Sequence, residues 1–172
     1  MFFQLTLEKE IMLHPRNFGP KMREVLKASL KQQVEGTCDG RHGYIVIVTR
    51  IHDTNPGVIV EGTGWAKFQV KYECIVFRPF KGEILECVVK EVTKFGFFAE
   101  AGPQQIFVSE YMIPSDYQFS SVDEACYISI DGMERIRKDS EVRLKVMGTC
   151  IENTEIKCIG SIKEDYLGLI SD

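Results

Sequence analysis

Histidine and cysteine are the side chains in this sequence that most often carry nucleophilic, acid–base or metal chemistry. The three histidines, His14, His42 and His52, fall at predicted turns or strand ends. None of them has a serine or cysteine partner in a recognisable nucleophile motif. Cys38 and His42 have half of a zinc-like spacing, but nothing supplies a second half. The sequence therefore predicts no active site, no metal site and no cofactor.

Aromatic residues around a glycine form a more informative cluster. The stretch KFGFF, residues 94–98, predicts a tight turn between two strands, and Phe107 lies on the next strand. Alternation places Phe97 and Phe98 on opposite faces, so one belongs to the core and the other faces outward. An outward phenylalanine can stack on a base, which contributes ~1–3 kcal/mol per base. The alternative, left open by the residues, is that these side chains only fill a small barrel.

Basic residues near this cluster are candidates for contacts with phosphate groups. They are Lys90, Lys94, Arg135, Arg137 and Lys138.

The first part of the chain combines one helix pattern with several strand patterns. Apolar residues three or four positions apart predict a helix from Arg16 to Val34, with a ragged entry at Pro15 and Pro20. Strands are expected at residues 2–13, 44–51, 58–60 and 65–77. This order predicts an α+β sheet with one helix packed on it. Residues 53–64, rich in glycine and proline, predict a projecting hairpin-like tip.

The second part of the chain is predicted to be all β. Strands are expected at residues 83–92, 96–101, 105–109, 140–150 and 155–162. Five short strands separated by turns favour a closed barrel of the OB type. A mostly polar stretch around residues 114–139 is interpreted as an insertion that lies over the barrel. The proline at position 79 favours a boundary near it, with domains at 1–80 and 81–172.

Composition limits the classes of protein that the chain can represent. Of its residues, 44% are hydrophobic and 27% charged, as in an ordinary globular protein. No apolar run approaches the ~20 residues that cross a bilayer, and the N-terminal residues do not resemble a signal peptide. The six cysteines form no CxxC pair and are expected to be reduced, so we expect the protein in the cytosol or nucleus.

The charge is unevenly distributed between the two predicted domains. Residues 1–80 carry 11 Lys and Arg against 8 Asp and Glu, whereas residues 81–172 carry 10 against 17. Their formal charges are therefore +3 and −7. Proteins that bind nucleic acid tightly on their own usually have a basic excess. We expect RNA contact by the second domain to be weak, with a shallow dependence on salt.

The second domain resembles the S1 RNA-binding domain, which is an OB barrel. The resemblance is carried by GEIL at 82–85, FGFF at 95–98, Gly102 and FVS at 107–109. In that family the RNA face includes the aromatic residue before the glycine, the aromatic residue two positions after it, and a residue of the third strand. The resemblance assigns these roles to Phe95, Phe98 and Phe107. Among the nearby basic residues, Lys90, Lys94 and Arg135 are the further RNA-binding candidates.

The whole chain resembles the seventh-subunit family of eukaryotic RNA polymerase II. Four separated blocks carry this resemblance: LHPRNFGP at 13–20, VEGTCDGRHGY at 34–44, VKYECIVFRPFKGE at 70–83 and GSIKEDYLGLI at 160–170. The resemblance implies a non-catalytic stalk subunit in the nucleus, whose first domain is truncated and RNP-like. It also implies pairing with the fourth subunit, docking on the polymerase core near the clamp and the RNA exit channel, and contact with nascent single-stranded RNA during initiation and elongation.

The tip and a neighbouring segment become the candidate core-docking surface under this resemblance. The residues concerned are Arg16, Asn17, Phe18, Gly19, Pro20, Asn55, Pro56, Gly57 and Val58. The insertion and the interdomain boundary become candidate contacts for the fourth subunit. Two alternatives stay open: the equivalent subunit of a paralogous polymerase of the plant silencing type, and a free-standing S1-domain RNA-binding protein.

Overall fold

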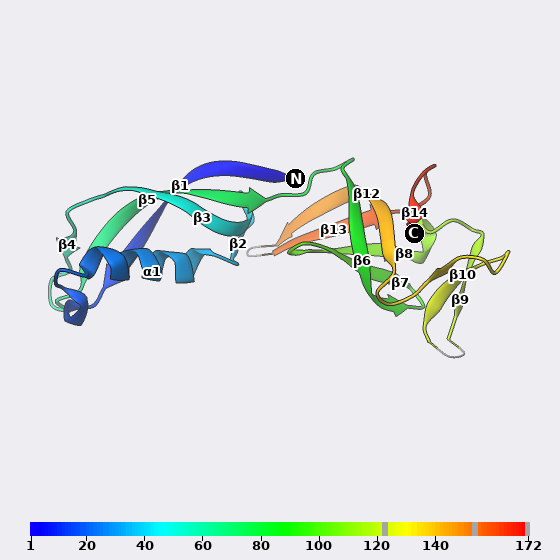
Figure 1. The fold of residues 1–172 in the computed structure, drawn as a ribbon, viewed down its shortest axis with the longest axis horizontal. Coiled ribbons are helices and arrows are strands. Elements are labelled where there is room, and N and C mark those ends of the chain that lie inside the picture. Colours follow the sequence, from blue (N-terminus) through cyan, green and yellow to red (C-terminus); the bar gives the residue numbers. More distant parts are fainter. Residues whose placement is uncertain (122–123, 153–154, 171–172) are drawn as a thin grey trace. The chain divides into compact units, whose positions relative to one another are not determined.

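The computed structural model describes residues 1–121, 124–152 and 155–170, apart from the side chain of Asp53. The chain divides into two compact units, Met1–Arg78 and Pro79–Asp172 (Figure 1). Each unit has its own sheet and its own buried apolar side chains.

The first unit is built on an antiparallel sheet. Its central strand β5 (Ala66–Phe77) pairs with all of β1 (Phe2–Leu13) on one side and with β3 (Gly43–Thr54) on the other. The short β2 (Cys38–Asp39) pairs with β3, and β4 (Val58–Ile59) pairs with the start of β5. Alternate side chains along β5 are buried, so the sheet has one buried face and one outer face.

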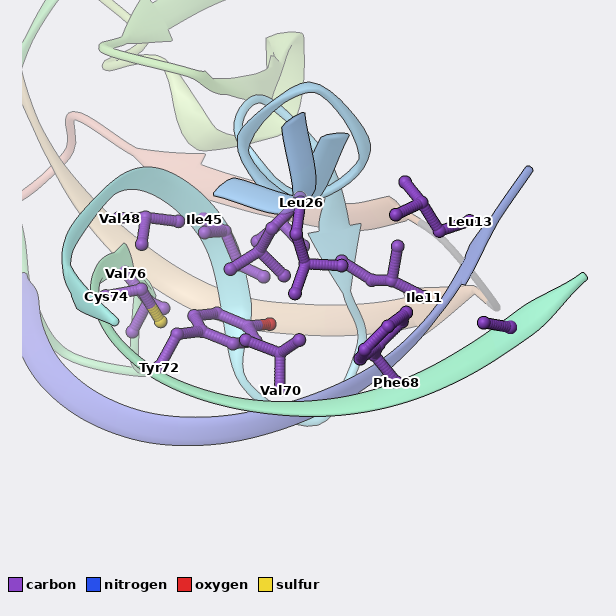
Figure 2. Close-up of a cluster of buried hydrophobic side chains, with 13 residues drawn as sticks. Ile11, Leu13, Leu26, Ile45, Val48, Phe68, Val70, Tyr72, Cys74 and Val76 are labelled. Atoms are coloured by element: carbon purple, nitrogen blue, oxygen red, sulfur yellow. The ribbon is translucent and has the colours of Figure 1, made fainter. Parts of the chain in front are cut away.

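One helix covers the buried face of this sheet. Helix α1 (Met22–Val34) buries Leu26, Leu30 and Val34, whose spacing of four places them in one stripe. Figure 2 shows the resulting core, in which side chains from β1, β3 and β5 gather around Leu26. This packing confirms the predicted α+β arrangement with a single helix.

The helix begins later than the sequence pattern indicates, so the predicted start at residue 16 is wrong. Residues Pro15–Asn17 form a separate 3-10 turn, η1, in which the ring Nδ1 of His14 accepts a hydrogen bond from the Arg16 amide. Phe18 is extended, with φ −76° and ψ 122°, which ends that turn. Pro20 has no N–H to donate, and it disfavours a helical conformation in the residue before it. A continuous helix from residue 16 is therefore excluded.

The second unit is a closed five-stranded barrel with one short additional strand. Its strands are β6 (Ile84–Thr93), β7 (Gly96–Ala101), β8 (Gln104–Ser109), β12 (Glu141–Glu152), β13 (Glu155–Ser161) and β14 (Gly168–Leu169). The order is β13-β8-β7-β6-β12-β14, and β13 also pairs with β12, which closes the ring. Strands β13 and β8 are parallel. The barrel confirms the predicted OB-type fold of this part.

A small sheet, absent from the sequence prediction, lies within the expected insertion at 114–139. It consists of β9 (Tyr117–Ser120), β10 (Cys126–Ser129) and β11 (Arg135–Ile136), in the order β11-β10-β9. We call it the inserted sheet; residues 122 and 123 of the same segment lie outside the described residues. Strands of two to four residues are too short for alternation to be recognised in a sequence.

Candidate nucleic-acid interface

The turn between β6 and β7, residues 93–96, presents Phe95 to solvent. We call it the aromatic turn. Phe95 is 71% exposed, whereas Phe97 is fully buried. Gly96 has a φ of +145°, and a Cβ at this position would lie 2.1 Å from the carbonyl oxygen of Val108. Only glycine allows the turn to approach β8 so closely.

Phe98 and Phe107 form an aromatic pair on the outer face of the barrel. They lie directly opposite each other on β7 and β8, and their ring centroids are 4.8 Å apart. Both rings are half-buried. Ile159, opposite Phe107 on β13, continues this row of outward apolar side chains. Because the two rings contact each other, they offer one joint apolar platform and no slot between them.

The charges beside this platform nearly balance. Lys90 Nζ lies 3.5 Å from the carboxylate of Glu100. Glu91 is opposite Phe98 in the β6–β7 ladder, so its side chain shares the outer face. Lys94 is exposed on the aromatic turn. With both signs present, the surface favours stacking of bases over general attraction of phosphates.

Arg135 stands apart from the other residues predicted to contact RNA. It lies on β11 beside Ile136, which is fully buried and directly opposite Tyr127 of β10. Neighbouring residues of a strand point to opposite faces, so Arg135 is on the face of the inserted sheet away from Tyr127. Arg137 and Lys138 follow β11 in the chain and are exposed. The remaining predicted residues all lie on β6, β7, β8 or the aromatic turn: Lys90, Lys94, Phe95, Phe98 and Phe107.

Tyr127 contacts the aromatic turn directly, although no sequence pattern singled it out. Its side chain is buried, and its hydroxyl lies 2.9 Å from the Thr93 carbonyl oxygen and 3.1 Å from that of Lys94. Burial, and secondarily the charge of Glu110, raise the pKa of Tyr127. The hydroxyl therefore keeps its proton at neutral pH, and this single proton is shared between the two carbonyl oxygens.

The two segments predicted to dock on a polymerase core lie at the same end of the first unit. The His14 ring packs edge-on against Trp65, with centroids 4.9 Å apart. A Cβ at Gly64 would lie 3.5 Å from Pro15. These contacts join the residues just before Arg16 to the end of the tip.

The tip carries exposed apolar side chains on a short hairpin. Val58 is 68% exposed and its neighbour Ile59 is 66% exposed, both on β4. Gly57 has a φ of +83° and packs on the buried ring of Phe68. All the remaining predicted docking residues are exposed: Arg16, Asn17, Phe18, Gly19, Pro20, Asn55 and Pro56.

Comparison with known proteins identifies both units. Residues 8–64 match the "SHS2 domain found in N terminus of Rpb7p/Rpc25p/MJ0397", and residues 78–158 match the "S1 RNA binding domain". The chain is 57% identical over its full length to DNA-directed RNA polymerase II subunit RPB7 of Glycine max, covering 98% of that protein. It is 54% identical to DNA-directed RNA polymerase II subunit 7 of Arabidopsis thaliana, again covering 98%. The chain belongs to the RPB7 family of RNA polymerase II subunits.

Similarity to a paralogous polymerase subunit is much lower. DNA-directed RNA polymerase V subunit 7 of Arabidopsis thaliana is 29% identical to the chain over its whole length, against 54% for the polymerase II subunit of the same plant. This difference assigns the chain to the polymerase II branch and settles the alternative of a paralogous polymerase that the sequence had left open. RPB7 is a non-catalytic subunit, so the prediction that the protein is not an enzyme is confirmed.

The histidines of this RPB7-family member take part in local contacts. His42 Nδ1 lies 2.5 Å from Asp39, and His52 Nε2 lies 2.7 Å from Glu73. The hydrogen bond from His42 lowers the pKa of Asp39. Among the residues whose placement is given, no group of His, Cys, Asp or Glu is arranged to hold a metal ion. None of the described helices is long and apolar enough to span a membrane.

Proposed function

We propose that this polymerase II subunit is a nuclear stalk subunit that pairs with the fourth subunit, docks on the polymerase core with its tip, and contacts nascent single-stranded RNA with its barrel. The docking position is near the clamp and the RNA exit channel, and the RNA contact operates during initiation and elongation. The subunit contributes binding surfaces and no chemistry to the polymerase.

The exposed aromatic platform is the observation that carries the RNA contact. Phe95 stands almost free in solvent on a turn that glycine holds against β8, and the Phe98–Phe107 pair lies on the neighbouring strands. Leaving phenyl rings partly in water gives up hydrophobic stabilisation that the core would supply. Stacking of an unpaired base recovers part of that free energy and requires no particular base sequence.

The acidic balance of the barrel supports a contact that depends on the polymerase. Its formal charge of −7 over residues 81–172 opposes long-range attraction of RNA. A polymerase that brings RNA to the barrel raises the local concentration of RNA there, so that long-range attraction is not needed. The isolated chain therefore binds RNA weakly, while the assembled enzyme contacts RNA efficiently.

The tip supports the proposed docking. Val58 and Ile59 are exposed on β4, and the His14–Trp65 contact holds the end of the tip against the residues just before the 16–20 segment. Exposed apolar side chains on a small projecting hairpin suit insertion into a pocket of a partner protein. Burial of one valine side chain stabilises a contact by about 1.5 kcal/mol or more.

Crosslinking of RNA in the assembled polymerase tests the barrel contact. Phe98→Ala is expected to lower crosslinking to nascent RNA about tenfold, since one stacking contact is lost. Assembly with the other subunits is expected to stay intact. Tyr166→Ala, which removes another exposed aromatic side chain of the same unit, is the matched control and should leave crosslinking unchanged. Unchanged crosslinking per folded molecule in Phe98→Ala would show that Phe98 only fills the barrel.

Co-purification with the polymerase core tests the tip. Val58→Asp is expected to reduce recovery of the large subunits while the fourth subunit still co-purifies. Ile151→Asp introduces the same charge at another exposed β-strand position and should retain both partners. Equal recovery of the core by the two variants would exclude docking through Val58.

A further inference from the structure

Every carbonyl group of the aromatic turn accepts a hydrogen bond. The carbonyls of Thr93 and Lys94 face the Tyr127 hydroxyl at 2.9 Å and 3.1 Å. The carbonyl of Phe95 accepts from the Glu110 amide at 2.9 Å. The carbonyl of Gly96 accepts from the Thr93 hydroxyl at 2.8 Å. Two other segments of the chain, at Tyr127 and at Glu110, and the turn's own Thr93 side chain therefore fix the backbone that carries Phe95.

Tyr127 is itself held in one orientation. It is 3% exposed, it lies directly opposite Ile136 in the inserted sheet, and its ring packs edge-on against Phe119 at 5.6 Å between centroids. Its ring thus belongs to the core between the inserted sheet and the barrel, while its hydroxyl reaches the aromatic turn. The ring can fill that space without the hydroxyl, so packing and positioning are separable in a variant.

The benefit of such a contact follows from the exposure of Phe95. A side chain that is 71% exposed has few packing contacts to restrict it, so its direction depends on the backbone beneath it. A base that stacks on a mobile ring must first immobilise it, which weakens binding. When all carbonyls of the turn accept hydrogen bonds, the backbone below Phe95 is already immobilised before RNA binds.

We propose that Tyr127 is a positioning residue for RNA, whose hydroxyl fixes residues 93 and 94 and so orients Phe95 for stacking. The inference rests on the proposed RNA contact of the barrel. It gives the inserted sheet a role in RNA binding although none of its strands carries the aromatic platform. Tyr127 acts through Phe95 and does not itself touch the base.

A double-mutant cycle in the full-length chain separates positioning from simple stability. Binding of a fluorescent single-stranded oligouridine is measured for the original chain, Tyr127→Phe, Phe95→Ala and the double variant. Tyr127→Phe is expected to weaken binding about threefold to tenfold, and to have no further effect once Phe95 is alanine. Each affinity is referred to the folded fraction from a parallel unfolding curve, so a loss of stability is not counted as a loss of binding.

Tyr117→Phe is the matched control, because its hydroxyl donates to Glu134 within the inserted sheet and has no described contact with the aromatic turn. It should leave RNA binding unchanged. The backbone ¹⁵N heteronuclear NOE of Lys94 and Phe95 supplies a readout without RNA. It should fall in Tyr127→Phe and stay constant in Tyr117→Phe.

Two outcomes overturn the positioning role. One is an equal loss of affinity on removing the Tyr127 hydroxyl with and without Phe95, which shows a general structural effect. The other is an unchanged affinity and an unchanged NOE in Tyr127→Phe. Failure of the proposed RNA contact itself gives a different result: Phe95→Ala and Phe98→Ala both bind the oligouridine as tightly as the original chain. That result also excludes the positioning role of Tyr127.

Discussion

The aromatic turn and the tip both expose apolar side chains, but the chain holds them by different means. In the aromatic turn, backbone carbonyls accept hydrogen bonds from residues as distant as Tyr127, 34 positions away. The hydrogen bonds of the tip stay within its own hairpin: the Val60 amide donates to the Trp65 carbonyl, Thr63 bonds back to Val60, and the Asn55 amide donates to the Gln69 carbonyl on β5. Ring contacts add the remaining support, such as that between His14 and Trp65.

This difference separates a surface fixed by tertiary structure from one fixed by its own turn residues. A contact surface that depends on distant partners is ordered only when the whole unit is folded. A hairpin supported locally can adjust its side chains without disturbing the core. Single substitutions should therefore affect the aromatic turn through the fold of the barrel, and the tip mainly through its own glycines.

The largest expected effect is at Gly96. A Cβ there would lie 2.1 Å from the Val108 carbonyl oxygen, which is backbone and cannot move aside without breaking the β7–β8 ladder. We expect Gly96→Ala to lower the free energy of unfolding by about 3 kcal/mol or more. Chemical denaturation followed by circular dichroism measures this loss.

Gly102→Ala provides the matched control for that experiment. Gly102 also has a positive φ, +60°, but a Cβ there meets nothing within 4 Å. The control should lose only about 1 kcal/mol, the ordinary strain of a left-handed backbone. Similar losses in the two variants would mean that conformation alone, and not the approach to β8, requires glycine in the aromatic turn.

The sequence predicted the elements with clear periodicity and missed the contacts between them. Alternation placed Phe97 and Phe98 on opposite faces, and the S1 resemblance assigned the outward face to Phe98, as the structure has it. The strand patterns located all five barrel strands. It gave no sign of the inserted sheet, because strands of two to four residues contain too few alternations. The role of Tyr127 depends on a hydroxyl reaching a turn more than thirty residues away in sequence, which no local pattern encodes.

A similar limit applies to the tip. The glycine- and proline-rich composition predicted a projecting hairpin, and the structure has β4 and β5 paired there. The composition did not distinguish one glycine from another. Only the structure reveals that Gly57 packs against Phe68 while Gly62 is open, because that distinction depends on a ring eleven residues further along the chain.

Gly57 and Gly62 therefore give the next largest effect. Their φ values are nearly equal, +83° and +82°, so alanine introduces the same backbone strain at both. At Gly57 the new Cβ would also lie 2.5 Å from the buried Phe68 ring. We expect Gly57→Ala to lose about 1–3 kcal/mol more stability than Gly62→Ala, which is the usual penalty for overpacking. Thermal or urea unfolding of the two variants measures the difference.

The result also decides how docking variants of the tip are interpreted. If Gly57→Ala is the less stable variant, reduced binding to the polymerase core by any larger residue at 57 reflects a damaged hairpin. Val58 then remains the informative position, because its side chain already points into solvent. Equal stability of the two glycine variants would show that the Phe68 ring can move aside and that the packing of the tip can accommodate an added methyl group.

The smallest effect expected is electrostatic and concerns the barrel. Each phosphate neutralised on a single strand contributes about −0.7 to the slope of log affinity against log salt concentration. Lys94 is exposed on the aromatic turn, whereas Lys90 lies 3.5 Å from Glu100. Binding of the oligouridine over a range of salt concentrations should give a shallow slope that Lys94→Ala reduces by about 0.7. Lys90→Ala should change the slope less, because Lys90 is already paired with Glu100 and is less available to neutralise a phosphate. Equal reductions would mean that RNA displaces Glu100 from Lys90. The platform would then bind phosphates through both lysines, as a basic groove does, and stacking on its aromatic residues would not be its main means of binding RNA.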